Sequence, residues 1–198
     1  MPVVYAYEPS SDPADVSFTP DNLDSGRMAA DHLMSRGRRR IALVNGDPSF
    51  AAAQERAQGA REALAAKGLE LVGGDGLFGE WSESWGRQCT EMLLTSGQPL
   101  DAIIAGNDLV ARGVLDQLRE SGRHVPADVA VVGFDNWDVL ARYSRPPLSS
   151  VDMNLVELGR TVAQELSRAI DGSLAPGVRL LPVRMVPRES TASIQPPR

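Results

Sequence analysis

Three short runs of apolar residues, without polar alternation, set the basic pattern of the chain. They are Ile41–Val44, Ala102–Ala105 and Val129–Val132. Strands that are buried on both faces of a sheet read in this way, and such strands are typical of parallel sheets. The segments between them carry apolar residues at helical spacing, so strands and helices alternate along the chain. This alternation predicts an α/β protein with a parallel sheet.

The flanking segments complete this pattern. Three prolines between residues 8 and 20 predict a loop there. Trp85, Cys89, Met92 and Leu93 follow helical spacing and are assigned to a helix core rather than to chemistry. Leu158, Val162, Leu166 and Ile170 form one stripe on a later helix. The predicted helices are 21–35, 51–66, 82–96, one from 107 to the glycine at 122, and one from 155 to 170; further strands are predicted at 1–7, 77–80, 148–152 and 178–186, with a turn at 172–177.

Composition narrows the function classes. The chain has 198 residues and a net charge of −6, which argues against binding nucleic acid through phosphates because such binding needs a clustered positive field. The single cysteine, Cys89, excludes an intrachain disulfide and a cysteine metal cluster, and with only two histidines we expect no metal site and no other cofactor. The chain has neither a run of about 18 apolar residues nor a signal peptide, so we expect no membrane contact and a cytoplasmic location.

Polar residues follow two of the buried strands where those strands end. Asn107 and Asp108 come after one strand, and Asp135 and Asn136 come after another. Ligands of open α/β sheets bind at the carboxyl ends of the strands. Either Asn107 or Asp108 is expected to cap the following helix while the other faces the cleft.

These segments, in their order and spacing, resemble the LacI/GalR-type bacterial transcription regulators. The resemblance covers about residues 1–191 and rests on the segments 38–46, 56–59, 102–108, 125–136, 145–151 and 188–191. It implies a two-lobed, parallel-sheet, periplasmic-binding-protein-like (type I) fold in which three connections cross between the lobes. Residues 1–39 and 153–176 would form the amino-terminal lobe, residues 40–152 and 177–192 the carboxyl-terminal lobe, and residues 193–198 a tail.

The resemblance also implies that the amino-terminal lobe is incomplete. The family places a helix-turn-helix and three βα units before this point, which amounts to roughly 90 residues of lobe at about 30 per unit. Met1 is therefore either an internal methionine of a longer protein or the start of a shortened chain. Operator DNA would be bound only through a helix-turn-helix that this chain does not contain.

The family's effector site and dimer contact map onto specific residues. The resemblance implies a ligand, between the lobes, facing Asp24, Phe50, Arg56, Trp81, Asn107 and Asp135. Carboxylates, amides and an arginine fork suit vicinal hydroxyls, and an indole covers the CH face of a sugar ring. Phe50 and Ala52 stand where purine-responsive members carry polar residues, which favours a carbohydrate. The implied homodimer contact includes Arg112, Leu115, Arg119 and Tyr143, with Leu115 pointing outward.

Two other functions remain as alternatives. A solute-binding protein of a sugar ABC transporter shares the two-lobed fold, although the absence of a signal peptide and the ending Arg188-Glu189-Ser190-Thr191 favour the regulator. An enzyme is the remote alternative, in which Asp108 and Asp135 hold Mg²⁺ for phosphoryl transfer. The chain has neither a phosphate-binding GxxxxGK[ST] loop nor a GxSxG nucleophile motif, so we expect no enzyme.

Overall fold

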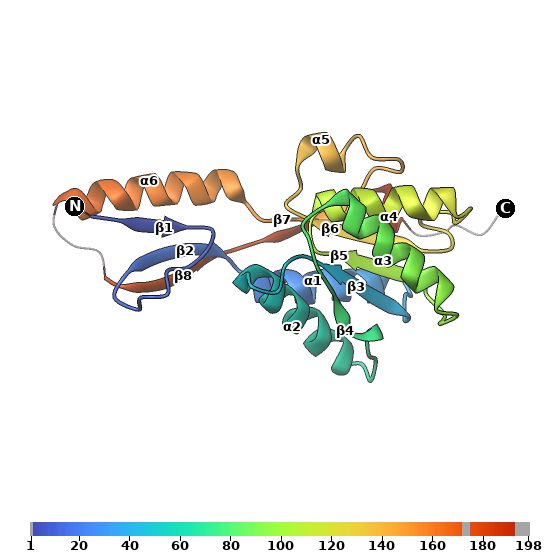
Figure 1. Cartoon of the computed structure of the whole chain (residues 1–198). Coiled ribbons are helices and arrows are strands. Elements are labelled where there is room, and N and C mark those ends of the chain that lie inside the picture. Colours follow the sequence, from blue (N-terminus) through green and yellow to red (C-terminus); the bar gives the residue numbers. More distant parts are fainter. Residues whose placement is uncertain (1, 172–174, 193–198) are drawn as a thin grey trace.

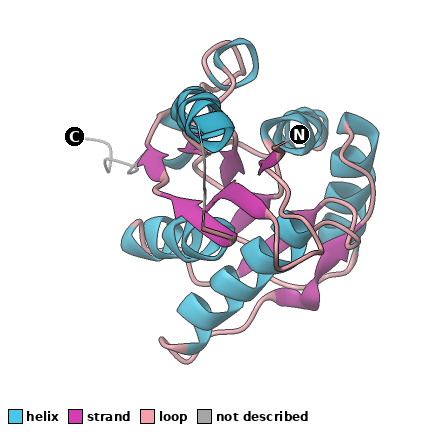
Figure 2. Cartoon of the chain, turned by 90° about the vertical axis from the view of Figure 1, so that its left-hand side faces the viewer, coloured by secondary structure: helices cyan, strands magenta, loops and turns pink. Residues whose placement is uncertain are grey.

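Two separate sheets organise the computed structural model, which describes residues 2–171 and 175–192. A six-stranded sheet with helices on both faces forms the larger unit, and a three-stranded sheet with one helix forms the smaller unit. The two units lie end to end, which gives the molecule an elongated shape (Figure 1). Figure 2 looks along this long axis from the smaller unit. The predicted α/β class with parallel sheets is confirmed.

The larger sheet is parallel except at one edge. Its strand order is β4-β3-β5-β6-β7-β9, and only β9 runs antiparallel to its neighbour. Two helices lie on each face of the sheet. A short helix follows the fourth strand in this order, and a 3-10 turn follows the last. The elements are β3 (Ile41–Asn45), α2 (Ala51–Ala65), β4 (Val72–Phe78), α3 (Glu83–Thr95), β5 (Ala102–Ala105), α4 (Asp108–Glu120), β6 (Ala130–Phe134), α5 (Asp138–Ala141), β7 (Ser149–Asp152), β9 (Arg184–Val186) and η1 (Glu189–Thr191), with α1 (Asn22–Ser35) preceding them.

The apolar runs supply two cores at once. In β3, Ile41 and Leu43 face the core formed with α1 and α2, while Ala42 and Val44 face the core formed with α3 and α4. β5 and β6 divide their residues in the same way. Because successive side chains of a strand point to opposite faces, a strand covered on both sides favours apolar residues at successive positions. This is the physical reason for the unbroken runs in the sequence.

The smaller unit is a parallel three-stranded sheet. Its order is β1 (Val4–Ala6), β2 (Val16–Pro20) and β8 (Gly177–Leu181), and α6 (Leu155–Asp171) packs against it. The core is small and consists of Val16, Phe18, Leu158 and Leu181 with three half-buried neighbours. Val178 and Leu180 of β8 are 54% and 59% exposed, so part of this sheet's surface is uncovered in the described chain.

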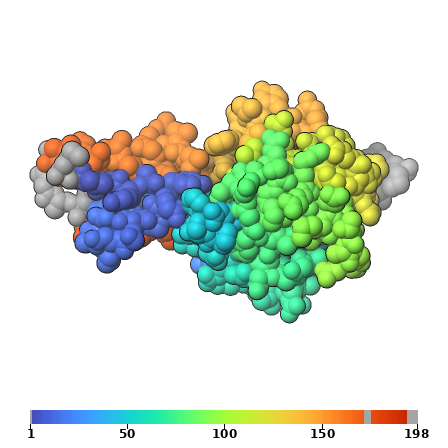
Figure 3. All heavy atoms as spheres, in the orientation of Figure 1, coloured from blue at the N-terminus to red at the C-terminus, as the bar shows by residue number. Residues whose placement is uncertain are grey.

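The chain passes between the two units three times. The crossings lie between β2 and α1, between β7 and α6, and between β8 and β9. Figure 3 shows the molecule narrowing where these segments run from one unit to the other. Leu155, at the start of α6, packs against the cores of both units and therefore lies at the junction.

The expected lobe boundaries need two corrections. Helix α1 is expected in the amino-terminal lobe, but its Ala29, Ala30 and Leu33 pack into the core of the larger sheet. Residues 177–181 are expected in the carboxyl-terminal lobe, but they pair in parallel with β2 in the smaller sheet. Only β9, beyond Pro182, joins the larger sheet. The single strand expected at 178–186 is therefore two strands, one in each unit.

Three local expectations are also wrong. Residues 16–20 form strand β2 rather than part of a loop. Pro20 is tolerated because it stands at the end of the strand, and the polar Ser17 and Thr19 are buried within it. Met92 is 48% exposed and lies off the buried stripe of α3. On α6, Leu158 is buried but Ile170 is 70% exposed. The predicted turn at 172–177 lies partly, and the tail at 193–198 wholly, outside the described residues.

Helices α1 and α2 approach each other unusually closely. A Cβ atom on Gly59 would stand 1.9 Å from the Leu23 carbonyl oxygen, and one on Gly26 would stand 2.1 Å from the Arg56 carbonyl oxygen. Both obstacles are backbone atoms, which cannot rotate away as a side chain can. Glycine at these two positions therefore permits the crossing that presses Arg56 of α2 against α1.

This packing yields a prediction for two matched Gly→Ala substitutions. Gly59→Ala should destabilise the protein by about 1–3 kcal/mol, because overpacking outweighs the gain in helix propensity. Gly159→Ala should instead stabilise it by roughly 0.5–1 kcal/mol, since Gly159 is exposed on α6 and a Cβ there meets nothing within 4 Å. Urea unfolding of both variants measures the difference. Equal effects from the two substitutions would contradict a tight crossing at Gly59.

Candidate functional site

A cleft of about 440 Å³ opens at the junction of the two units. The smaller unit contributes residues from the β1–β2 connection and from the start of α6, and the larger unit contributes residues beyond the carboxyl ends of its strands. Most of the lining is apolar or aromatic, with a few polar groups, as is usual for small-molecule sites. The lining residues are Tyr7, Phe50, Ala52, Arg56, Trp81, Asn107, Asp135, Trp137 and Leu155.

Arg56 is the buried cation of this cleft, with a side chain only 1% exposed. Its Nε donates to Asn22 Oδ1 at 3.1 Å, and its Nη1 donates to the Gly106 carbonyl oxygen at 2.7 Å. Its Nη2 lies 3.5 Å from the Tyr7 hydroxyl oxygen of the smaller unit. The guanidinium also stacks over the Phe134 ring, 4.9 Å from the ring centroid. These contacts hold the arginine fork rigid at the floor of the cleft.

Asp135 stands opposite Arg56 without a hydrogen bond to it. Its Oδ1 lies 3.8 Å from Arg56 Nη2, beyond hydrogen-bond length. Among the described residues, this buried oxygen has no hydrogen-bond partner. Burial raises the pKa of the Asp135 carboxyl, and the charge of Arg56 and the hydroxyl of Tyr7 oppose that rise. A ligand hydroxyl in this space can donate to the carboxylate and accept from the guanidinium.

Aromatic side chains form one wall of the cleft. The Phe50 and Trp81 rings meet edge to face, with centroids 6.2 Å apart and an interplanar angle of 83°. The Trp81 indole lies directly on Gly46, where an added Cβ would stand 2.0 Å from the ring. Glycine at position 46 therefore lets the indole lie flat against the end of β3. Phe50 is 44% exposed and borders the opening.

The Asn107-Asp108 pair departs from the expected division of one capping residue and one cleft residue, because Asn107 takes both roles and Asp108 lies behind the cleft. Asn107 Oδ1 accepts from the Val110 N–H at 2.8 Å and caps α4, yet Asn107 also lines the cleft. Asp108 is buried, with Oδ1 accepting from the Ser150 hydroxyl at 2.7 Å and Oδ2 accepting from the Trp137 N–H at 2.8 Å. With both oxygens engaged, Asp108 is unsuited to share Mg²⁺ with Asp135. It is a positioning residue that ties the Trp137 loop to β7.

Five of the six residues predicted for the ligand site come together in this cleft. Phe50, Arg56, Trp81, Asn107 and Asp135 all line it. Asp24 does not, because α1 begins at Asn22 and position 24 falls on its exposed outer face. The Asp24 N–H donates to Asp21 Oδ1, the cap of α1. The neighbouring Asn22 is buried against Arg56 instead. Asp24 is therefore withdrawn from the site.

Sequence reasoning missed Tyr7, Trp137 and Leu155 as lining residues, and Asn22 behind Arg56. Tyr7 belongs to the smaller unit and reaches the cleft from a turn with φ +75°, which nothing in the local sequence announces. Trp137 follows Asp135 and Asn136, which both have positive φ (+91° and +55°). Non-glycine residues adopt that region rarely, and Asn and Asp do so most readily. The Asp-Asn pair before an aromatic residue was the available signal for Trp137.

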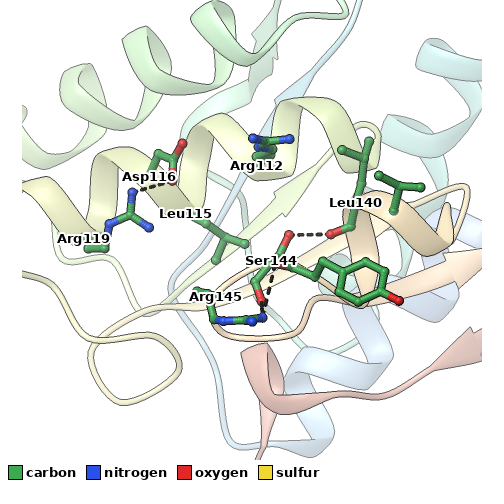
Figure 4. A pocket seen from close by; sticks show the side chains of 9 residues that line it. Arg112, Leu115, Asp116, Arg119, Leu140, Ser144 and Arg145 are labelled. Atoms are coloured by element: carbon green, nitrogen blue, oxygen red, sulfur yellow. Dashed lines mark hydrogen bonds and ion pairs between the residues drawn. The ribbon is translucent and has the colours of Figure 1, made fainter.

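The residues predicted for a dimer contact line a separate hollow of about 390 Å³ between α4 and the segment that follows α5 (Figure 4). Arg112, Leu115, Arg119 and Tyr143 all border it. Leu115 does not point outward as expected, since it is 3% exposed and belongs to the core between α4 and the sheet. It is shielded from solvent because α5 packs against α4 there. The exposed apolar residues at this hollow are Val139 and Tyr143, at 75% and 71%.

The comparison with known proteins decides the family. Residues 30–191 match the model of the periplasmic binding protein-like domain. The chain belongs to that family. The resemblance to LacI/GalR-type regulators is confirmed within it.

This periplasmic binding protein-like domain is similar to proteins that are named as a transcriptional regulator and an operon repressor. It is 38% identical over 96% of its length to the HTH-type transcriptional regulator CelR of Thermobifida fusca, covering 56% of that protein. It is 32% identical over 85% of its length to the lactose operon repressor of Escherichia coli K12, covering 46% of that protein. The chain thus spans about half the length of the curated relatives it matches.

Two solved structures are similar to the domain across nearly its whole length. One is a transcriptional regulator CelR–cellobiose complex, with TM-score 0.87, 35% identity, and coverage of 94% of this chain and 58% of that chain. The other is the lac repressor dimer bound to operator and the anti-inducer ONPF, with TM-score 0.87, 29% identity, and coverage of 96% and 56%. Within residues 2–171 and 175–192, no helix has the length and apolar character of a membrane span, and no three candidate metal ligands are grouped.

Asp108 gives the domain a predicted pH dependence. Burial raises the pKa of its carboxyl from 3.8 to about 7, with the nearby Asp135 charge adding to the rise, while hydrogen bonds from Ser150 and the Trp137 N–H oppose it. The folded state therefore keeps a proton that the unfolded state loses. Asp108 contributes stability fully below about pH 4, and this contribution is lost as the pH rises to about 7.

Asp108→Asn should remove that loss, because the amide oxygen can accept from the Trp137 N–H while its nitrogen donates to the Ser150 hydroxyl. Relative to the unmodified protein, the variant should gain stability steadily between pH 4 and pH 7 and no further above that range. Urea unfolding at several pH values measures this difference. A constant offset across the range would show that Asp108 does not titrate as its burial predicts.

Proposed function

We propose that this chain is the effector-binding and dimerisation module of a LacI-type transcription regulator, and that its effector is a carbohydrate. The observation that carries the proposal is the Arg56–Asp135 pair, which is spaced 3.8 Å apart at the floor of the cleft with a buried carboxylate oxygen that has no partner in the described chain. Charged groups of opposite sign at this spacing suit a hydroxyl that both donates and accepts. Vicinal hydroxyls satisfy several such groups at once.

The apolar lining supports a sugar over a more polar ligand. Trp81, Phe50, Trp137 and Leu155 surround the polar pair with flat or branched apolar surface. A pyranose ring has CH faces that pack on such rings while its hydroxyl edge meets polar groups. The similar CelR structure is described as a complex with cellobiose, which supports the same ligand class for this chain.

The remaining parts of the proposal follow from the relatives. CelR is named an HTH-type regulator, and the match covers 56% of it, so we infer that operator DNA is bound by a helix-turn-helix outside these 198 residues. A regulator of chromosomal DNA acts in the cytoplasm. Its task is binding and not catalysis, and both oxygens of Asp108 are already committed to protein donors. The transporter solute-binding protein remains the alternative, but CelR and the lactose operon repressor are both regulators.

We also propose that the hollow between α4 and the segment after α5 is the contact between two copies of the chain. It combines exposed apolar residues with Arg112, Asp116 and Arg119, which is the mixture of apolar centre and polar rim found at interfaces. A twofold axis through this hollow would place the same patch of both copies together. The similar lac repressor structure is described as a dimer.

The ligand proposal is tested by Asp135→Asn, which keeps the shape of the side chain and tolerates its positive φ. Loss of the carboxylate should weaken sugar binding by about 10- to 100-fold, because hydrogen bonds to charged groups contribute about 1.5–3 kcal/mol. Calorimetric titration of the full-length protein with a panel of sugars is the measurement. Asp75→Asn, an equal change of charge on the exposed surface of β4, is the control and should bind normally. Unchanged binding by Asp135→Asn would remove the ligand from this cleft.

The dimer proposal is tested by Val139→Glu. A carboxylate at this 75% exposed position would be buried against its symmetry mate and should weaken dimerisation on the order of 10- to 100-fold. Met92→Glu, which places the same charge at a 48% exposed position on α3 away from the hollow, is the control. Sedimentation equilibrium of the full-length protein compares the two. If both variants remain as dimeric as the unmodified protein, the contact lies on another face.

A further inference from the structure

A second hollow of about 430 Å³ adjoins the main cleft. The two share Asp135, Trp137 and Leu155, so they meet along these three residues. The hollow is lined by Asp135, Asn136, Trp137, Asp138, Asp152, Asn154, Leu155, Val156 and Arg184. Four residues on its far side do not line the main cleft: Asp152, Asn154, Val156 and Arg184.

We propose that this hollow is a second sugar subsite and that the effector is an oligosaccharide of at least two rings. The inference rests on the proposed function, because it takes the first ring to lie between Arg56 and Asp135. The second ring would then extend past these three shared residues into the adjoining hollow. Volumes of about 440 and 430 Å³ give the two rings similar space.

Trp137 is suited to both rings. Its side chain is 57% exposed although its backbone is fixed, since its N–H donates to the buried Asp108 carboxylate at 2.8 Å. An indole with a rigid backbone and an accessible surface can stack on a sugar ring at little entropic cost. Because it borders both hollows, one side chain can contact the glycosidic linkage and the rings beside it.

The charges of the hollow favour a neutral ligand. Arg184 donates to Asp152 through Nε at 3.1 Å and through Nη2 at 2.8 Å. Asp138 forms an ion pair with Arg142, in which Oδ1 lies 3.0 Å from Nε. These two carboxylates are therefore compensated within the protein, and neither a phosphate nor a cation would find an unbalanced charge on this side. Carboxylate, amide and guanidinium groups that keep free hydrogen-bonding capacity suit hydroxyl groups.

The hollow also lies on two of the three crossings between the units. Asp152 and Asn154 flank the passage from β7 to α6, and Arg184 follows the passage from β8 to β9. Leu155 and Val156 are the first two residues of α6, which packs on the smaller sheet. A ring in this hollow therefore touches both units at the segments that join them.

The test fills the hollow without touching the main cleft. Val156→Phe adds bulk at a 70% exposed position that lines only the second hollow. Ile170→Phe is the matched control, because Ile170 is on the same helix and also 70% exposed but lines neither hollow. The full-length protein is titrated calorimetrically with cellobiose, lactose and maltose and with glucose and galactose.

We expect at least one disaccharide to bind about 10-fold or more tightly than its constituent monosaccharides. Val156→Phe should weaken that disaccharide by about 10-fold and leave monosaccharide binding within about 2-fold, while Ile170→Phe changes neither. Monosaccharides that bind as tightly as every disaccharide would overturn the second subsite and leave the carbohydrate proposal standing. The second subsite would also be overturned if Val156→Phe had no effect on binding, or if it weakened monosaccharides and disaccharides equally. If no sugar binds, the proposed function fails and the subsite fails with it.

Discussion

The buried guanidinium of Arg56 is the constraint around which the junction of the two units is built. A charged side chain at 1% exposure is tolerated only where its donors are satisfied, since removing it from water costs several kcal/mol. Three regions meet that need: Asn22 at the start of α1, the Gly106 carbonyl at the end of β5, and Tyr7 of the smaller unit. The close crossing at Gly26 and Gly59 brings α1 near enough to take part. Arg56 therefore joins both units while one side of it still faces Asp135 and the cleft.

The rim of the larger sheet shows how parallel-sheet architecture gathers polar chemistry in one place. Strands β5 and β6 are apolar along their whole length, so the polar residues that follow them, Asn107, Asp108 and Asp135, come to the same edge of the sheet. Asp108 then fixes that edge by accepting hydrogen bonds from β7 and from the Trp137 loop. Leu155 extends the arrangement across the junction, because it packs in both cores and borders both hollows.

The sequence revealed the fold where one physical rule decides the outcome. Strands β3, β5 and β6 can be predicted from their apolar runs alone, because burial on both faces favours apolar residues at successive positions. Prediction from the sequence failed where packing between distant segments determines the secondary structure. Residues 16–20 contain two polar residues and end in proline, and only pairing with β1 and β8 makes them a strand. The split of residues 177–186 between two sheets likewise depends on which unit each half reaches, as does the place of α1.

The same division applies to the candidate site. Asp135 could be predicted because its residue type and its position just beyond a strand end point to the cleft, whereas Arg56, inside α2, was assigned through the resemblance to LacI/GalR-type regulators. Asp24 could not be corrected from the sequence, since a shift of two residues at a helix start decides whether a side chain faces Arg56 or solvent. Leu115 would point outward on an isolated helix, but α5 covers its side chain. The first outcome depends on the exact start of α1, and the second on an element that packs over α4.

The central claim is that the ligand bridges Arg56 and Asp135, and a crystal structure of the full-length protein with a bound sugar effector tests it most directly. We expect a sugar hydroxyl oxygen within about 3 Å of both Asp135 Oδ1 and Arg56 Nη2, with a ring face on Trp81. That hydroxyl would supply the hydrogen bond that Asp135 Oδ1 otherwise lacks among the described residues. A sugar bound elsewhere, with the Arg56–Asp135 space filled only by water, would contradict the assignment of this cleft.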